Sequence, residues 1–177
     1  LEGGFGRVEL GSNIDAGSAL KVDASNLARG SGGIDNRYRQ FVTFPTIAGS
    51  GFISAPDLPS AHGPAVGAPV PGATEDANKI SYFTPRFSGF QFGISYTPDL
   101  GDSGTATGFT GDNNGDQENV FNIGANYSQK LGGLDLDASV TAEFGSAELP
   151  GTEDLAAYAL GVNLGFSGVT LGGSYGD

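Results

Sequence analysis

The stretch "LDLDASVTAEFG", residues 134–145, alternates apolar and polar side chains without a break. Its even positions, from Leu134 to Phe144, are all apolar, and its odd positions are Asp, Ser, Thr, Glu or Gly. A period of two indicates a β-strand with one apolar and one polar face. The stretch is about twice as long as an ordinary globular strand. A soluble sandwich would bury the apolar face, whereas a membrane barrel would turn it toward lipid.

The same alternation recurs along the chain and predicts that residues 1–177 are part of a single all-β, antiparallel domain. Helix periodicity is almost absent. The region 12–77 lacks alternation and is rich in Gly, Pro, Ser and Ala. The seven strands predicted are residues 3–11, 79–85, 90–98, 119–130, 134–145, 155–166 and 169–176.

Composition excludes several classes of protein. The chain has no Cys, which rules out disulfides, thiolate metal sites and a Cys nucleophile. Its net charge of −12 argues against nucleic acid as a partner, because phosphates would be repelled. Gly makes up 31 of 177 residues without a collagen period, which suits closely packed, curved β-ribbon. No apolar run is long enough for a transmembrane helix.

The predicted connections alternate in length. Residues 86–89, 131–133 and 167–168 make tight turns, whereas 99–118 and 146–154 are longer polar loops. In a series of antiparallel hairpins, all tight turns then meet at one end of the sheet and all loops at the other. The strands also approach the roughly 9–11 residues that a tilted transmembrane strand needs.

Aromatic residues gather near the ends of the predicted strands. Two such bands are expected where a barrel crosses both headgroup layers of an outer membrane, and a soluble sandwich does not require them. We therefore predict an up-and-down transmembrane β-barrel with a polar lumen. Seven strands leave open edges, so we expect further strands before Leu1 and after Asp177. The girdle candidates are Phe90, Tyr127 and Phe166 toward the turns, and Tyr96, Phe121, Phe144, Tyr158 and Tyr175 toward the loops.

Two stretches resemble one family. "GGFGRVELGS" (3–12) resembles the strand that enters the inward-folded third loop of Gram-negative trimeric porins, and "NKISYFTPRFSGFQFGISYTPD" (78–99) resembles the hairpin after that loop. The pattern resembles that of porins of the alphaproteobacterial type. It implies a 16-stranded general diffusion porin of the outer membrane, of which this chain is a middle portion with about seven strands. It also implies a homotrimer in contact with lipid and lipopolysaccharide, no cofactor, and small solutes and ions in transit.

The resemblance further implies that 12–77 is the loop that narrows the channel, with an extra hairpin at 36–45. The family places carboxylates in this loop, opposite basic residues of the wall. The sequence departs from that pattern, because the loop also carries basic residues and lacks a Pro-Glu-Phe-Gly-Gly motif. The loop candidates for the narrowest ring are Asp15, Asp23 and Asp35 with the basic Lys21, Arg29, Arg37 and Arg39.

Other charged residues fall on the predicted polar faces of strands. Asp135, Asp137 and Glu143 would project into the lumen and enrich cations there, giving a weak cation preference. An ordinary solvated face would place them equally well. Arg7 and Glu9 share a face, and they would either line the pore at the loop entrance or form a plain surface pair.

The sequence gives little support for metal binding or catalysis. Asp112, Asp116 and Glu118, with the asparagines between them, offer oxygen ligands for Ca²⁺, but their spacing misses the EF-hand loop and also suits a plain turn. His62 lies in Pro/Gly-rich sequence without a catalytic partner, so we expect no enzyme. The alternatives to a channel are a structural or adhesive barrel domain and, less favoured, a hydrolytic barrel enzyme.

Overall fold

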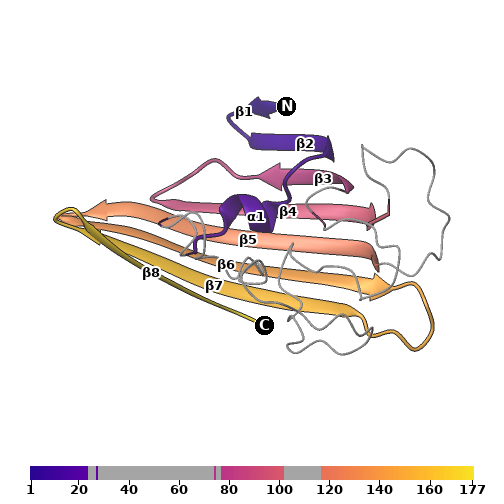
Figure 1. Ribbon diagram of the computed structural model, residues 1–177. Helices are drawn as coiled ribbons and strands as arrows, with labels where there is room; N and C mark the ends of the chain where they lie inside the picture. The colour runs from indigo at the N-terminus through magenta and orange to yellow at the C-terminus, as the bar shows by residue number, and fades with distance from the viewer. Residues whose placement is uncertain (24–26, 28–73, 75–76, 102–116) are drawn as a thin grey trace.

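The computed structural model describes residues 1–23, 27, 74, 77–101 and 117–177. They form one antiparallel sheet in which each strand pairs with its neighbours in the chain (Figure 1). The only helix in the described part is α1, Ala16–Leu20. The strands are β1 (Glu2–Gly3), β2 (Gly6–Ser12), β3 (Asn78–Phe83), β4 (Phe90–Asp99), β5 (Gln117–Leu131), β6 (Leu134–Ala147), β7 (Leu155–Phe166) and β8 (Val169–Gly176).

The antiparallel up-and-down β architecture predicted from alternation is confirmed. The seven strand ranges read from the sequence overlap β2 to β8, and the structure adds the two-residue β1 beside β2. β5 extends beyond its expected range to Gln117, and β6 beyond its own to Ala147. α1 lies in the region without alternation, and the expected hairpin at 36–45 lies outside the described residues. No helix of the described part has the length and apolar character to cross a membrane.

The tight turns all lie at one end of the sheet, at the left of Figure 1. Ser88–Gly89 and Ser167–Gly168 have positive φ at both residues, as the type I′ turns of two-residue hairpins require. Gly132 also has positive φ in the turn between β5 and β6. The connections from β2 to β3, from β4 to β5 and from β6 to β7 lie at the opposite end.

The two faces of the sheet have opposite chemistry and inverted exposure. On the polar face, Ser95 is 1% exposed and Asn122 is fully buried, because α1 lies against them. On the apolar face, Ile123 is 44% and Val140 47% exposed. A protein in water normally buries apolar residues and exposes polar ones, so this inversion indicates a lipid-facing apolar face. Other exposed side chains of the apolar face are Ile80, Phe92, Ile94, Leu160, Val162, Leu164 and Leu171.

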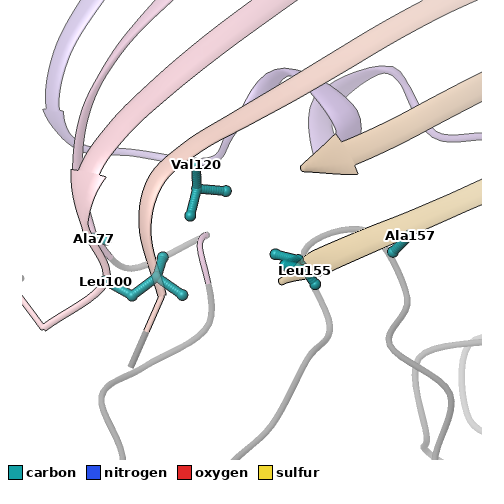
Figure 2. Packing of buried hydrophobic residues seen from close by; sticks show 5 residues of the cluster. All are labelled: Ala77, Leu100, Val120, Leu155 and Ala157. Carbon is teal, nitrogen blue, oxygen red and sulfur yellow. The ribbon is translucent and has the colours of Figure 1, made fainter. Parts of the chain in front are cut away.

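Buried apolar residues form two small clusters in the described part. Ala16 and Leu20 of α1 pack with Phe83 at the end of β3. The second cluster lies where the strands meet the longer connections, at the ends of β3, β4, β5 and β7 (Figure 2). The polar face is therefore polar in its middle and apolar at this end. The members of the second cluster are Ala77, Leu100, Val120, Leu155 and Ala157.

Candidate functional site

Residues 13–23, here called the inner segment, lie against the polar face and contain α1. Asp15 starts the helix as its N-cap, and its Oδ1 accepts a hydrogen bond from the Ser18 amide at 2.9 Å. Asp favours this position because its side chain satisfies an amide that the helix leaves unpaired. The helix ends at Leu20, and Lys21 returns to an extended backbone. Figure 1 shows α1 lying over β4 and β5.

Wall side chains hold the N-terminal half of the inner segment by its backbone. The Ser95 hydroxyl of β4 accepts a hydrogen bond from the Ala16 amide at 2.8 Å. Asn122 Oδ1 of β5 accepts one from the Gly17 amide at 2.5 Å. Ser95 and Asn122 are directly opposite each other in the sheet, so the two bonds form one rung beneath the helix start. The first amides of α1 are thus satisfied by the wall as well as by the cap.

Side chains of β5, β6 and β7 hold the C-terminal half, again by its backbone. The Ser139 hydroxyl of β6 accepts a hydrogen bond from the Val22 amide at 2.8 Å. Asn126 Nδ2 donates to the Leu20 carbonyl, and Asn163 Nδ2 of β7 to the Asp23 carbonyl, both at 3.2 Å. In each of these bonds the wall side chain binds a backbone atom of the inner segment. We call Ser95, Asn122, Asn126, Ser139 and Asn163 the polar row.

Glycines let the inner segment approach the wall. A Cβ added to Gly161 would overlap the carbonyl oxygen of Val22. At Gly124 it would lie 2.8 Å from the Ala16 carbonyl oxygen, and at Gly93 3.0 Å from the Ala16 Cβ. A side chain at these positions would push the inner segment away from the wall, which gives a physical reason for glycine on the polar faces of β4, β5 and β7.

The two predicted carboxylates of the inner segment are inaccessible to solvent. Asp15 and Asp23 are both fully buried. Lys21 Nζ lies 3.9 Å from Asp23 Oδ2, so an acidic and a basic candidate for the narrowest ring of the channel form an ion pair. The other loop candidates Asp35, Arg29, Arg37 and Arg39 lie outside the described residues.

Arg7 and Glu9 lie on the polar face of β2, opposite Phe83 and Ser81 of β3. Arg7 Nε is 3.2 Å from Glu9 Oε1, and the guanidinium lies 4.4 Å from the centroid of the Phe83 ring. The two side chains are thus paired with each other and also face the side that carries α1. The ion pair agrees with the interpretation as a surface pair, and the position on the polar face agrees with the interpretation as pore-lining residues.

Asp135 and Asp137 occupy the polar face of β6 near the tight turns. Asp135 Oδ1 lies 3.2 Å from Lys130 Nζ, its direct neighbour on β5. Asp137 Oδ1 accepts a hydrogen bond from the Ser128 hydroxyl at 2.5 Å. The charge of Asp135 is therefore partly compensated, whereas the bond to Ser128 leaves the charge of Asp137 intact.

Glu143 lies on the same face of β6 but is fully buried, and its Oε1 accepts a hydrogen bond from the Thr74 hydroxyl. Its neighbour across the strands is Asn122 of the polar row. Lys79, which the sequence did not single out, is 5% exposed and donates to the Asn13 and Ala77 carbonyls. Its signal in the sequence is a basic residue at a polar-face position of an alternating strand.

Aromatic residues of the apolar face form two groups across neighbouring strands. Tyr96, Phe121 and Phe144 are consecutive partners on β4, β5 and β6, toward the longer connections. Phe90 and Tyr127 are partners near the tight turns, with ring centroids 4.6 Å apart. Of the other girdle candidates, Tyr158 and Tyr175 have ring centroids 6.4 Å apart toward the loops, and Phe166 ends β7 at the turn.

Metal chemistry gains no support from the part of the chain that the structure describes, where no three His, Cys, Asp or Glu residues are arranged to hold an ion. Of the calcium candidates, Glu118 belongs to β5, whereas Asp112 and Asp116 lie outside the described ranges. His62 lies outside them too.

The sheet thus joins an exposed apolar face to a polar face that carries a short inward-lying segment. Residues 1–177 match the family described as Gram-negative porin. The chain belongs to the Gram-negative porin family. This family implies an outer-membrane location and a porin-like role, and the exposed apolar face of β3 to β8 agrees with that location.

Relatives are found among rickettsial proteins. An uncharacterized protein of Rickettsia bellii (strain RML369-C) is 29% identical over 236 residues, and one of Rickettsia felis (strain ATCC VR-1525 / URRWXCal2) is 27% identical over 238 residues. Both alignments cover 100% of this chain and 52% of the relative. This porin-family chain therefore spans about half the length of the curated relatives it matches. No solved structure matches it significantly.

Proposed function

We propose that this porin-family chain forms about half of the wall of a water-filled channel, together with the segment that narrows it. The channel admits small hydrophilic solutes and ions through the outer membrane by passive diffusion. Its selectivity comes from pore size and from the field of charged residues on the polar face. No cofactor and no catalytic step belong to this proposal.

The observation that carries the proposal is the inner segment bound across the polar face. Ser95, Asn122 and Ser139 accept hydrogen bonds from its amides, and it rests on Gly124 and Gly161. A segment fixed on the inside of a curved wall reduces the open cross-section at that height. The polar row and the glycines therefore support a constriction built from residues 13–23.

A weak cation preference is the finer part of the proposal. The net charge of the chain is −12, and Asp137 keeps its charge on the polar face near the tight turns. A carboxylate in a low-dielectric wall raises the local concentration of cations. The Lys130–Asp135 and Lys21–Asp23 pairs reduce this field, which is why we propose a weak preference only.

The assembly that we propose is a 16-stranded barrel of the alphaproteobacterial general diffusion type, associated as a homotrimer. Partner subunits, lipid and lipopolysaccharide would contact the apolar face. Supporting this, the outward side chains of β4 to β7 between the two aromatic groups carry no charge, as with Ile94, Ile123 and Val140. A closed barrel also satisfies the edge strands, whose unpaired backbone groups are costly in hydrocarbon.

Reconstitution of the full-length protein into planar lipid bilayers tests the proposal. A channel gives discrete conductance steps that scale with salt concentration, and a reversal potential shifted toward cation selectivity in a salt gradient. A structural or adhesive surface barrel, the alternative function, gives a folded protein that inserts without steps. Folded, inserted protein that shows no conductance would reject the channel.

A further inference from the structure

Lys79 bridges the two ends of the long connection between β2 and β3. It lies on β3, opposite Gly11 of β2, and is 5% exposed. Its Nζ donates to the Asn13 carbonyl, just after β2, and to the Ala77 carbonyl at 2.6 Å, just before β3. Because an ammonium group has three donors, one lysine can bind both carbonyls. The chain thus leaves and re-enters the sheet at one cationic group.

A second contact holds the returning end at the wall. The Thr74 hydroxyl donates to Oε1 of Glu143 on β6, and both residues are fully buried. Glu143 lies directly opposite Asn122, which binds the Gly17 amide of the departing end. Neighbouring side chains of β5 and β6 therefore hold both ends of the connection.

Buried charged groups are expensive unless they are hydrogen-bonded or paired, so a lysine and a glutamate at such positions need a reason. The polar row binds the departing end of the connection, at residues 16–23. Glu143 and Lys79 bind its returning end, at Thr74 and Ala77. Lys79 also binds the departing end at Asn13, so these two side chains join the two ends.

We propose that Lys79 and Glu143 are positioning residues, a stem clasp that fixes both ends of the connection 13–77 and so keeps the inner segment at its place on the wall. As a determinant of the pore, this rests on the proposed channel function. The clasp acts on the inner segment in two ways. Lys79 binds Asn13, two residues before the cap residue Asp15, and Glu143 lies directly opposite Asn122, which binds the Gly17 amide.

Matched variants of the full-length protein separate the clasp from general damage. Thr74→Val removes the hydroxyl while keeping the shape, and Thr74→Ser keeps the hydroxyl. Lys79→Met removes the bridging donors, and Lys79→Arg keeps donors for both carbonyls. Lys130→Gln is the control for charge, because Lys130 is exposed, lies on the same face and pairs with Asp135. Folding is checked by gel mobility, and the Thr74 pair serves if Lys79→Met does not fold.

Hydrogen exchange of the folded protein reports the position of the inner segment without relying on conduction. We expect the amides of Ala16, Gly17 and Val22 to exchange roughly tenfold faster or more in Thr74→Val and Lys79→Met, since each loses a buried hydrogen bond. Thr74→Ser, Lys79→Arg and Lys130→Gln should exchange as the wild type does. Exchange unchanged in both Thr74→Val and Lys79→Met overturns the clasp.

Bilayer recordings then link the clasp to the channel. We expect Thr74→Val to show added sub-conductance levels and a broader current distribution, and Thr74→Ser to restore the wild-type record. Faster exchange with wild-type records overturns the link to the pore but leaves the clasp. A wild type without conductance steps rejects the channel function, while the exchange experiment still decides the clasp.

Discussion

Gly93 and Gly124 lie directly opposite each other on β4 and β5, and α1 rests on both. A Cβ on Gly93 would lie 3.1 Å from a Leu20 methyl carbon, and one on Gly124 3.2 Å from the Leu20 Cβ. Because neither glycine has a side chain, this pair lets α1 lie close to the sheet. The height of the inner segment above the sheet is therefore set by the absence of side chains beneath it.

Gly124→Ala should destabilise the protein by about 1–3 kcal/mol, because the new methyl group meets the Ala16 carbonyl oxygen, which cannot move as a flexible side chain would. Gly173→Ala on β8 is the control, since a Cβ there meets nothing within 4 Å. Urea unfolding in lipid vesicles measures both. Equal stability of the two variants would contradict the close approach of α1 to β5.

Asp137→Asn and Asp135→Asn should each lower the ratio of cation to anion permeability, because each removes one negative charge from the polar face. Asp135→Asn also takes away the carboxylate that lies 3.2 Å from Lys130 Nζ. Asp137 accepts a hydrogen bond from the neutral Ser128 hydroxyl, which the amide oxygen of Asn can still accept. Reversal potentials in a salt gradient measure both variants. An unchanged reversal potential in a variant would remove its carboxylate from the determinants of selectivity.

The alternation of residues 134–145 predicted which side chains of β6 share a face, because a strand's period of two depends only on local sequence. It could not predict what lies on that face. The Gly17–Asn122 bond joins residues 105 positions apart, and a polar side chain in a strand looks the same whether it faces water or another segment. The sequence therefore predicts that the residues of the polar row are on a polar face, but not that they bind the inner segment.

Two further features were hidden for different reasons. α1 has five residues, too few for a 3.6-residue period to show, and its cap at Asp15 sits in a Gly- and Ser-rich stretch that suits a loop. Leu155 and Ala157 are apolar at positions of the polar face, which alternation alone assigns to water. They are buried in one cluster with Val120 and Leu100, residues that are distant in the sequence (Figure 2).

Asn122→Ala should cost about 1–3 kcal/mol of unfolding free energy, since the Gly17 amide then loses its acceptor in a buried place. Gln129→Ala is the matched control on the same strand, because Gln129 is exposed near the tight turn and should change stability by less than about 0.5 kcal/mol. Urea titration monitored by gel mobility gives both values. If the two variants unfold together, the polar row does not hold the inner segment.

Ile123→Lys tests the orientation on which the channel depends. Ile123 is 44% exposed on the apolar face, between Phe121 and Tyr127 of the two aromatic groups. A lysine on a lipid-facing strand near the bilayer middle costs about 2–4 kcal/mol, whereas an exposed lysine in water costs almost nothing. We therefore expect Ile123→Lys to fold into vesicles with a stability reduced by that amount.

Ser128→Lys is the partner experiment, because Ser128 lies on the same strand, on the polar face, and is exposed. A wet lumen accepts that lysine, so Ser128→Lys should fold with stability close to the wild type and shift the reversal potential toward anions. The opposite order, with Ser128→Lys more damaging than Ile123→Lys, would mean that the polar face meets lipid. That result would remove the wet lumen and the constriction built on it together.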